Sequence, residues 1–219
     1  MNFRLPSILR GSQVKPESID RLTKDLADEQ KRRLPPGQFL TKKWPVLHYG
    51  GVPRFDERTW TFRVDGLVQN ELTFNYREFR ALPTKEIKAD IHCVTRWSKL
   101  DTQWVGVPPS VILDRANPLE NARHVVVHCE AGFTTNLPLE ALYDDDVLFS
   151  WHADGQDIPP EHGWPLRLVV PKRYFWKSAK WVRRIEVVFA DEPGFWERLG
   201  YHNDAHPWEE ERYQQKRWW

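Results

Sequence analysis

The 219-residue sequence predicts a single, loop-rich domain of the α+β class. Several apolar or alternating runs have the length and composition of β-strands, whereas only three segments carry helix signals. Seventeen prolines favour rigid turns over long uninterrupted helices. The length suffices for one well-buried domain, which we expect at residues 41–208, between an N-terminal arm (1–40) and a C-terminal tail (209–219).

The composition argues against several classes of partner. A net charge of +1 and 40% hydrophobic residues give no reason to expect a nucleic-acid partner or an acidic membrane surface. No segment approaches the roughly 20 apolar residues of a transmembrane helix, and we expect no transmembrane segment. The N-terminus lacks the apolar core of an export signal. Because Cys93 and Cys129 fit neither a CxxC zinc pattern nor a disulfide scaffold, we expect a cytoplasmic protein.

The first half of the chain is expected to contain two helices and two strands. Apolar residues recur at helical spacing among charges in residues 16–33, which predicts an amphipathic surface helix within the arm. Residues 58–64 alternate apolar and polar side chains, as a half-buried strand does. A short helix is expected at residues 75–82, and the alternating run 86–91 predicts a second strand that leads into Cys93.

The second half is expected to be mainly β-structure. Prolines at the start of residues 108–113 predict a helix, because proline fits a first helical turn. Strands are predicted at residues 124–129, 147–151, 166–170 and 181–189. The small polar residues of 132–138 suit a loop that approaches a ligand closely, and a plain turn explains them equally well.

Cys93 is the residue on which a functional hypothesis depends. It follows the predicted strand 86–91 and precedes a polar stretch that we expect to be a loop. A thiol at a strand end is held rigidly while its sulfur faces a cavity, and Arg96 is near enough in sequence to favour thiolate. Thiolate suits a soft or high-valent metal. The alternative is a cysteine that only packs as a small hydrophobe.

The residues after this strand resemble a known motif. Cys-Val-Thr-Arg-Trp-Ser (93–98), with Trp-Val-Gly-Val-Pro (104–108), resembles the molybdenum-ligand loop of the sulfite oxidase superfamily, especially its bacterial branch that contains the periplasmic methionine sulfoxide reductase catalytic subunit. The resemblance runs from about Trp44 to Trp208 and implies a mixed-sheet, molybdopterin-binding fold of the sulfite oxidase type. It also implies a Mo-molybdopterin cofactor, with Cys93 as metal ligand and catalytic residue.

The segment from His162 to Trp181 is similar to the family's pterin-binding segment. It contains His-Gly-aromatic-Pro-apolar-Arg, then Val-Val-Pro, then Lys-Trp. The cofactor's phosphate requires fixed cations and donors, which arginine and lysine supply. Taken without the resemblance, these residues are more simply explained as ordinary surface charges. With it, cofactor contacts are assigned to His162, Arg167, Ser178 and Lys180.

Three further segments gain expected roles from the resemblance. His48 and Tyr49 lie in a stretch similar to the one that passes beneath the pterin, and the loop with Thr134 and Thr135 corresponds to one beside the cofactor. Tyr201 lies in a segment similar to the one that brings a tyrosine to the metal. A positioned phenol there would donate a hydrogen bond to a substrate oxygen, although a structural tyrosine is an equal alternative.

Some positions depart from the family pattern. Leu47 stands where sulfite oxidases place an arginine, and Trp97 follows Arg96 where they have a second pair of arginines, so a dianion would lose part of its cationic cage. Thr95 replaces an acidic residue common in the sulfoxide-reducing branch. Without a haem or flavin motif, we expect a separate electron-transfer partner. The chain ends soon after Tyr201, which leaves no room for the dimerisation domain of sulfite oxidases, and we expect a monomer.

These features predict a molybdopterin-dependent oxidoreductase that catalyses two-electron oxygen-atom transfer. Its expected small-molecule substrate is a sulfur or nitrogen oxide. A pterin-binding protein without turnover and a structural domain with the same fold remain alternatives. A zinc hydrolase is disfavoured, because His92 and Cys93 would point to opposite faces of a strand and could not share one tetrahedral site.

Overall fold

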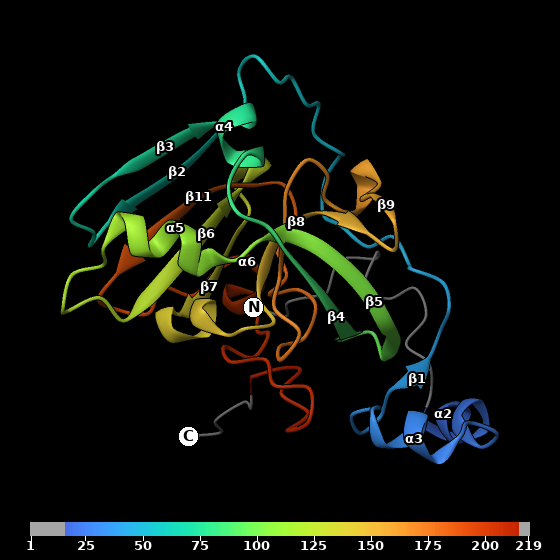
Figure 1. The fold of residues 1–219 in the computed structure, drawn as a ribbon. Coiled ribbons are helices and arrows are strands. Elements are labelled where there is room, and N and C mark those ends of the chain that lie inside the picture. Colours follow the sequence, from blue (N-terminus) through green and yellow to red (C-terminus); the bar gives the residue numbers. More distant parts are fainter. Residues whose placement is uncertain (1–15, 215–219) are drawn as a thin grey trace, which may run out of the picture.

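The protein folds into two mixed β-sheets with short helices around them, as seen in a computed structural model that describes residues 16–214 (Figure 1). The helices are α2 (Pro16–Thr23), α3 (Asp28–Arg32), α4 (Tyr76–Arg80), α5 (Pro109–Ala116) and α6 (Phe195–Arg198), with short 3₁₀ helices at Glu130–Gly132, Leu139–Tyr143 and Pro160–His162. The strands are β1 (Phe39–Leu40), β2 (Thr61–Gly66), β3 (Leu72–Asn75), β4 (Lys85–His92), β5 (Trp97–Val107), β6 (His124–Cys129), β7 (Thr134–Pro138), β8 (Leu148–Ala153), β9 (Gln156–Asp157), β10 (Arg167–Val169) and β11 (Val182–Val188). This architecture is the α+β class that the sequence predicts.

Each sheet combines parallel and antiparallel pairs. The six-stranded sheet has the order β1-β5-β8-β10, with β4 paired to β5 and β9 to β8; only β1 and β5 run parallel. The five-stranded sheet has the order β3-β2-β11-β6-β7, in which β2 and β11 are parallel neighbours. The last strand of the chain, β11, therefore lies in the centre of its sheet, which ties the end of the domain to its beginning.

The main core lies between the two sheets. Phe62 of β2 and Phe149 of β8 are both fully buried, and their rings meet at 5.1 Å in an edge-to-face contact. Ile112 and Leu113 of α5 add to the same cluster, which explains why this helix packs on the sheets. Full burial of each such side chain contributes about 1.5–3 kcal/mol of hydrophobic free energy.

A second core lies on the other face of the six-stranded sheet. Neighbouring residues of β10 point to opposite faces, so Leu168 joins the main core while Val169 joins the second. The second core also contains Trp104, Phe175 and Tyr201. It forms the base on which the cavity described below is built.

The stretch after Cys93 is a loop only over residues 94–96; from Trp97 onward it is a strand, and there our expectation of a loop is wrong. β5 has eleven residues and pairs with β4 as a hairpin. Its alternate residues Thr102 and Trp104 are fully buried, and this burial outweighs the polar character of the segment. The loop is confined to the few residues at the tip, where Arg96 adopts a φ of 79° in the left-handed region.

Two other segments differ from expectation. Residues 134–138 form β7 and are not a loop, because all five of them pair with β6. The helix expected over 16–33 is divided into α2 and α3, and the Thr23 hydroxyl donates to the Ile19 carbonyl (3.0 Å) at the end of the first. The remainder of the expected arm, residues 1–15, and the last five residues of the tail lie outside the described residues.

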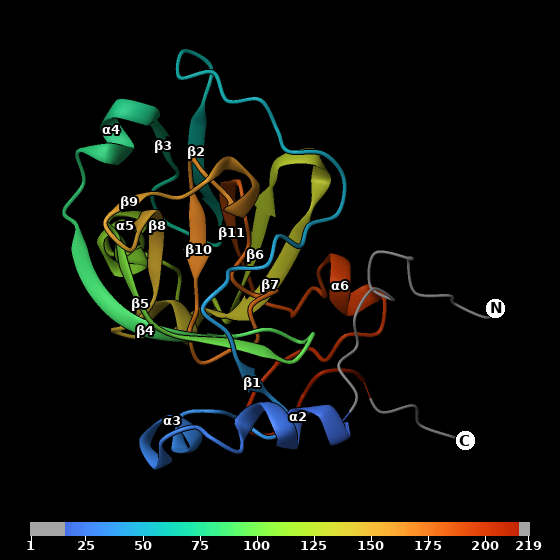
Figure 2. The ribbon, with the colours of Figure 1, turned by 90° about the vertical axis from the view of Figure 1, so that its right-hand side faces the viewer.

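The arm lies against the hairpin of β4 and β5. Figure 2 shows α2 and α3 beneath that end of the sheet, with β1 between them and the strands. Arg33 is the main connection: its guanidinium lies 2.6 Å from a carboxylate oxygen of Asp90 and 2.7 Å from one of Asp101. Within residues 16–214, no helix has the length and apolarity needed to cross a membrane.

Candidate active site

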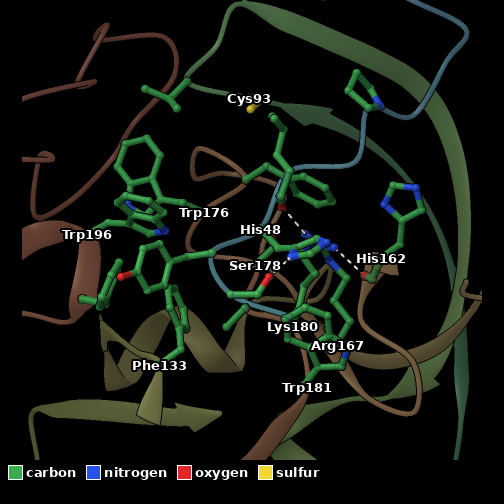
Figure 3. A pocket seen from close by; sticks show the side chains of 18 of the residues that line it. His48, Cys93, Phe133, His162, Arg167, Trp176, Ser178, Lys180, Trp181 and Trp196 are labelled. Carbon is green, nitrogen blue, oxygen red and sulfur yellow. Dashed lines mark hydrogen bonds between the residues drawn. The ribbon is translucent and has the colours of Figure 1, made fainter. Parts of the chain in front are cut away.

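A cavity of about 260 Å³ opens beside the tip of the β4–β5 hairpin. Its wall combines the segment 44–51, the hairpin tip, residues 130–133, the segment 162–181 and residues around α6 (Figure 3). Eight of the ten residues singled out in the sequence line it: Cys93, Tyr201, His48, Tyr49, His162, Arg167, Ser178 and Lys180.

Cys93 occupies a tight turn. Its backbone N–H donates to the Trp97 carbonyl (2.9 Å), and its carbonyl accepts from the Arg96 N–H (2.9 Å). The Thr95 hydroxyl donates to the Cys93 Sγ (3.1 Å). Burial raises the pKa of the thiol, while the Thr95 hydrogen bond and then the charges of Arg212 and Arg167 lower it. Arg96, which we expected to favour the thiolate, instead directs its guanidinium to the Gly37 carbonyl (3.2 Å).

Arg167 is a buried cation that faces the cavity. Only 2% of its surface is exposed, and its Nη1 donates to the His162 carbonyl (2.6 Å). Its guanidinium carbon lies 3.8 Å from the centre of the Phe175 ring, a cation–π contact. Burial lowers the pKa of Arg167 to about 9. The Nε of this side chain is buried and has no hydrogen-bond partner.

Lys180 places a second basic group beside Arg167. Its ammonium donates to the carbonyls of Leu47 (2.7 Å) and Glu161 (2.8 Å). Burial, and then the charge of Arg167, lower the pKa of Lys180 to about 7. Glu130, an acidic residue of the cavity wall, is paired with Arg183 (2.6 Å). Among the described residues, neither Arg167 nor Lys180 has a carboxylate partner, so the pair is suited to hold an anionic ligand.

His162 and Ser178 complete the polar side of the cavity. The His162 ring stacks on Trp44 with a centroid distance of 4.1 Å and an interplanar angle of 16°. Burial, followed by the charges of Arg167 and Lys180, lowers the pKa of His162 to about 4, so it is neutral near pH 7. The Ser178 Oγ accepts from the Val170 N–H (2.9 Å), which leaves its own O–H as a donor.

His48 and Tyr49 lie in a segment without regular secondary structure at the mouth of the cavity. The His48 Nδ1 is 2.9 Å from the Gly50 carbonyl, so this nitrogen carries the proton that is donated. The His48 ring meets the edge of Trp181 at 5.6 Å. Tyr49 is 57% exposed and lies 5.0 Å from the Phe195 ring.

Aromatic rings form the opposite side of the cavity. Trp176 and Trp196 lie across the cavity from Arg167 and Lys180 in Figure 3. The ring of the buried Tyr201 lies 5.0 Å from Trp176 and 5.1 Å from Trp196. Burial is the main cause that raises the pKa of Tyr201, with Tyr213 and Cys93 adding to it, so the phenol keeps its proton.

Thr134 and Thr135 do not line the cavity, contrary to their expected place beside the cofactor. As members of β7 they are held by pairing with β6. The Thr135 hydroxyl donates to Glu197 (3.2 Å) in the interior. The part of this segment that reaches the cavity is residues 130–133, where Phe133 lies 5.5 Å from Phe195.

A buried ion pair behind the aromatic side was missed in the sequence. The Lys177 ammonium lies 2.7 Å from Glu197 Oε1, an atom that also accepts from the Trp176 indole (3.0 Å). Lys177 donates further to the Asn136 carbonyl and side-chain oxygen, both at 2.9 Å. The sequence places Lys177 in a basic run, which gives no signal of burial; the ion pair depends on α6 returning to this loop.

The chain is similar to known proteins in sequence and in fold. The family described as the oxidoreductase molybdopterin binding domain matches residues 49–196. The chain belongs to this family. It is 45% identical over 186 residues to the uncharacterized oxidoreductase YuiH of Bacillus subtilis, a match that covers 84% of this chain and 94% of that protein.

Two other proteins are similar at greater distance. The protein-methionine-sulfoxide reductase catalytic subunit MsrP of Ralstonia nicotianae is 26% identical over 191 residues, which cover 78% of this chain and 57% of MsrP. The crystal structure of the sulfane dehydrogenase SoxCD from Paracoccus pantotrophus matches with a TM-score of 0.61 at 18% identity, over 86% of this chain and 60% of that one. The latter match confirms the sulfite-oxidase-type fold.

The cavity fits the cofactor of this family. This chain is a molybdopterin-dependent oxidoreductase of the sulfite oxidase superfamily, and its cofactor is Mo-molybdopterin. The unpartnered Nε of Arg167 and the lack of a carboxylate partner for Arg167 and Lys180, among the described residues, are what a bound phosphate would satisfy. The Cys93 thiol faces the same cavity, which suits a thiolate ligand to the metal.

Proposed function

We propose that the chain catalyses two-electron oxygen-atom transfer with a small sulfur- or nitrogen-oxide substrate. The observation that carries this proposal is that the Cys93 thiol and the cation pair Arg167 and Lys180 share one cavity. When bound, the molybdenum cofactor supplies the two-electron redox chemistry and the exchange of the oxygen atom. The protein supplies orientation, charge and exclusion of water.

The residues on the polar side would hold the cofactor. Cys93 would be the protein ligand of the metal, and Arg167 and Lys180 would hold the anionic phosphate by charge-assisted hydrogen bonds. Ser178 has an O–H to donate, and the neutral ring of His162 has one N–H. These roles use donors that the fold has already positioned and buried, so little ordering would be required on binding.

Tyr201 would act on the substrate. Its buried phenol keeps the proton, so it is a hydrogen-bond donor at the pH of the cell. A donor fixed in a buried site stabilises charge that develops on a substrate oxygen during transfer. Trp176 and Trp196 hold the Tyr201 ring from two sides and keep its direction constant.

The aromatic side favours an uncharged substrate. The arginine and lysine that line the cavity, Arg167 and Lys180, lie on the polar side, across from Trp176 and Trp196. An organic S-oxide or N-oxide with an apolar substituent would pack against these rings, whereas sulfite or nitrate would find no cation among them. MsrP, which is similar in sequence, is named as a protein-methionine-sulfoxide reductase.

Electrons would be exchanged with a separate protein. The sequence holds no haem or flavin motif, and MsrP is named as a catalytic subunit. We place the chain in the cytoplasm, which its two unpaired cysteines support, and we propose that it is a monomer. Cell fractionation tests the location, and light scattering of the purified protein tests the monomeric state. Proteins that co-purify with the chain are candidates for the electron-transfer partner.

Turnover with a reduced dye tests the proposed reaction. Molybdenum-loaded protein and its Cys93→Ser variant are assayed with the reduced dye and methyl phenyl sulfoxide, an aromatic N-oxide or nitrate. Sulfite is assayed in the oxidising direction, with the oxidised form of a dye as the electron acceptor. The proposal expects turnover of an organic oxide with a kcat/KM at least tenfold above that for either anion, and none in the variant. Loaded protein that turns over none of these substrates would instead support a pterin-binding protein without catalysis.

A further inference from the structure

The outer side of the Cys93 turn is held by two residues from opposite ends of the chain. The Gln38 amide nitrogen donates to the Cys93 carbonyl (3.0 Å), and Arg212 Nη1 donates to the next carbonyl, that of Val94 (3.0 Å). Gln38 is 2% exposed and Arg212 6% exposed. Glutamine and arginine are mostly exposed in proteins, so the burial of both side chains against two successive carbonyls of one turn indicates a specific role.

The N-terminal segment is itself firmly attached to the turn. The Phe39 N–H donates to the Arg96 carbonyl (2.8 Å), and Arg96 returns a hydrogen bond to Gly37 (3.2 Å). Parallel pairing of β1 with β5 continues this contact. Gln38 therefore lies between two residues, Gly37 and Phe39, that are hydrogen-bonded to the turn, and this fixes the position of its backbone.

The C-terminal segment reaches the same place. Arg212 Nη2 donates to the Pro36 carbonyl (3.1 Å), so one guanidinium connects the Cys93 turn with the N-terminal segment. Its guanidinium carbon also lies 4.8 Å from the centre of the Tyr174 ring. The neighbouring Tyr213 pairs with Tyr201, which lines the cavity.

We propose that Gln38 and Arg212 are positioning residues that fix the direction of the Cys93 side chain toward the metal. Because the Cys93 carbonyl is held by the Arg96 N–H and by Gln38, rotation of the backbone that would turn the Cβ–Sγ bond is opposed from both sides. Both residues lie outside residues 49–196, the part that the family matches. The inference rests on Cys93 as the metal ligand and is independent of the substrate.

Gln38→Met is the sharpest test, because methionine keeps the length of the side chain and removes the donor. Amide hydrogen exchange of the full-length, molybdenum-loaded protein is followed in the peptide that contains residues 93–97. We expect exchange there to increase about tenfold, the size of effect that one buried hydrogen bond has on a local opening. We also expect the metal's absorption and EPR signals to shift, because the thiolate direction changes.

The control removes an exposed hydrogen bond from a side-chain amide to a carbonyl elsewhere. Asn70 Nδ2 donates to the Arg115 carbonyl (3.0 Å) far along the chain from the turn, and Asn70→Ala is expected to change neither signal. Arg212→Met should act like Gln38→Met, and Arg212→Lys, which keeps one donor and the charge, should restore part of the change. These variants also cover the case in which Gln38→Met fails to fold.

Two results would overturn the proposal. In the first, exchange at residues 93–97 stays at the wild-type rate, or it increases there by no larger a factor than in β6. An equal increase in β6 would indicate general destabilisation. In the second, exchange increases at the turn but the metal spectra do not move. Hydrogen exchange at the turn can be measured even if the protein binds no molybdenum. Missing molybdenum therefore counts against the proposed function, and unchanged exchange in the variants counts against this inference.

Discussion

Lys177 and Glu197 form an ion pair of 2.7 Å whose side chains are 1% and 0% exposed. Glu197 also accepts hydrogen bonds from Trp176 and Thr135. One carboxylate therefore connects a ring of the cavity wall to β7 of the five-stranded sheet. We therefore expect Glu197→Ala to lower the free energy of unfolding by about 3–5 kcal/mol, because it leaves the Lys177 charge buried with only the neutral oxygens of Asn136 as partners. Denaturant titration measures this change.

An exposed pair provides the control for that variant. Arg77 and Glu57 are 2.8 Å apart, with side chains that are 88% and 44% exposed. Glu57→Ala should change the free energy of unfolding by less than about 1 kcal/mol, since exposed pairs contribute little. Equal effects of the two variants would contradict the structural role of the buried pair.

Retention of the cofactor should depend on Arg167. Arg167→Met keeps most of the side-chain volume and removes the charge, and we expect at least a tenfold loss of pterin and molybdenum per chain. Lys172→Met removes a lysine from the exposed surface, where it pairs with Asp144 (3.1 Å), and should leave both contents unchanged. Full pterin content in the Arg167 variant would show that the anion is held elsewhere.

Tyr201 should affect the rate and not the cofactor. Tyr201→Phe retains the ring contacts with Trp176 and Trp196 and removes only the hydroxyl. We expect kcat to decrease about 10²-fold with unchanged molybdenum content, a typical effect of removing a positioned donor. Tyr143→Phe, at a tyrosine that is 44% exposed, is the matched control. A wild-type kcat in Tyr201→Phe would leave this tyrosine a structural role.

The attachment of the arm should depend on pH. Hydrogen bonds from Arg33 and Lys88 lower the pKa of Asp101 from 3.8 to about 2. Because the pKa is lower in the folded state, this pairing stabilises the protein above pH 3.8, and the stabilisation disappears as the pH falls through 2. Arg33→Gln should therefore reduce stability at neutral pH by about 1 kcal/mol, since Asp101 is exposed and Arg33 and Asp90 are only partly buried. Urea titrations from pH 2 to 6 should show the two proteins converging at the acid end.

The sequence predicted the elements whose residues follow a clear period. The alternation of Trp60, Phe62 and Val64 corresponds to a buried face of the sheet, and Cys93 does come directly after the end of a strand. The polar character of residues 99–103 concealed β5, because its stability comes from pairing with β4 and not from local composition. Tertiary pairing decided the structure at that point.

The same distinction applies to the site. His162, Arg167 and Lys180 were found because they lie in one short segment with a recognisable order of residue types. Gln38 and Lys177 carry no such signal, since each is defined by a partner more than 15 residues away. Thr134 and Thr135 were assigned by the position of their segment, and strand pairing placed them away from the cavity.

The central claim is that Cys93 holds a molybdenum in this cavity, and metal analysis beside a Cys93→Ser variant tests it most directly. Protein made in a cofactor-competent host with molybdate is analysed for molybdenum and for pterin fluorescence after denaturation. We expect close to one molybdenum and one pterin per chain, with metal absorption and EPR spectra that change in Cys93→Ser. Folded protein without molybdenum, or identical metal spectra in the two proteins, would contradict the claim.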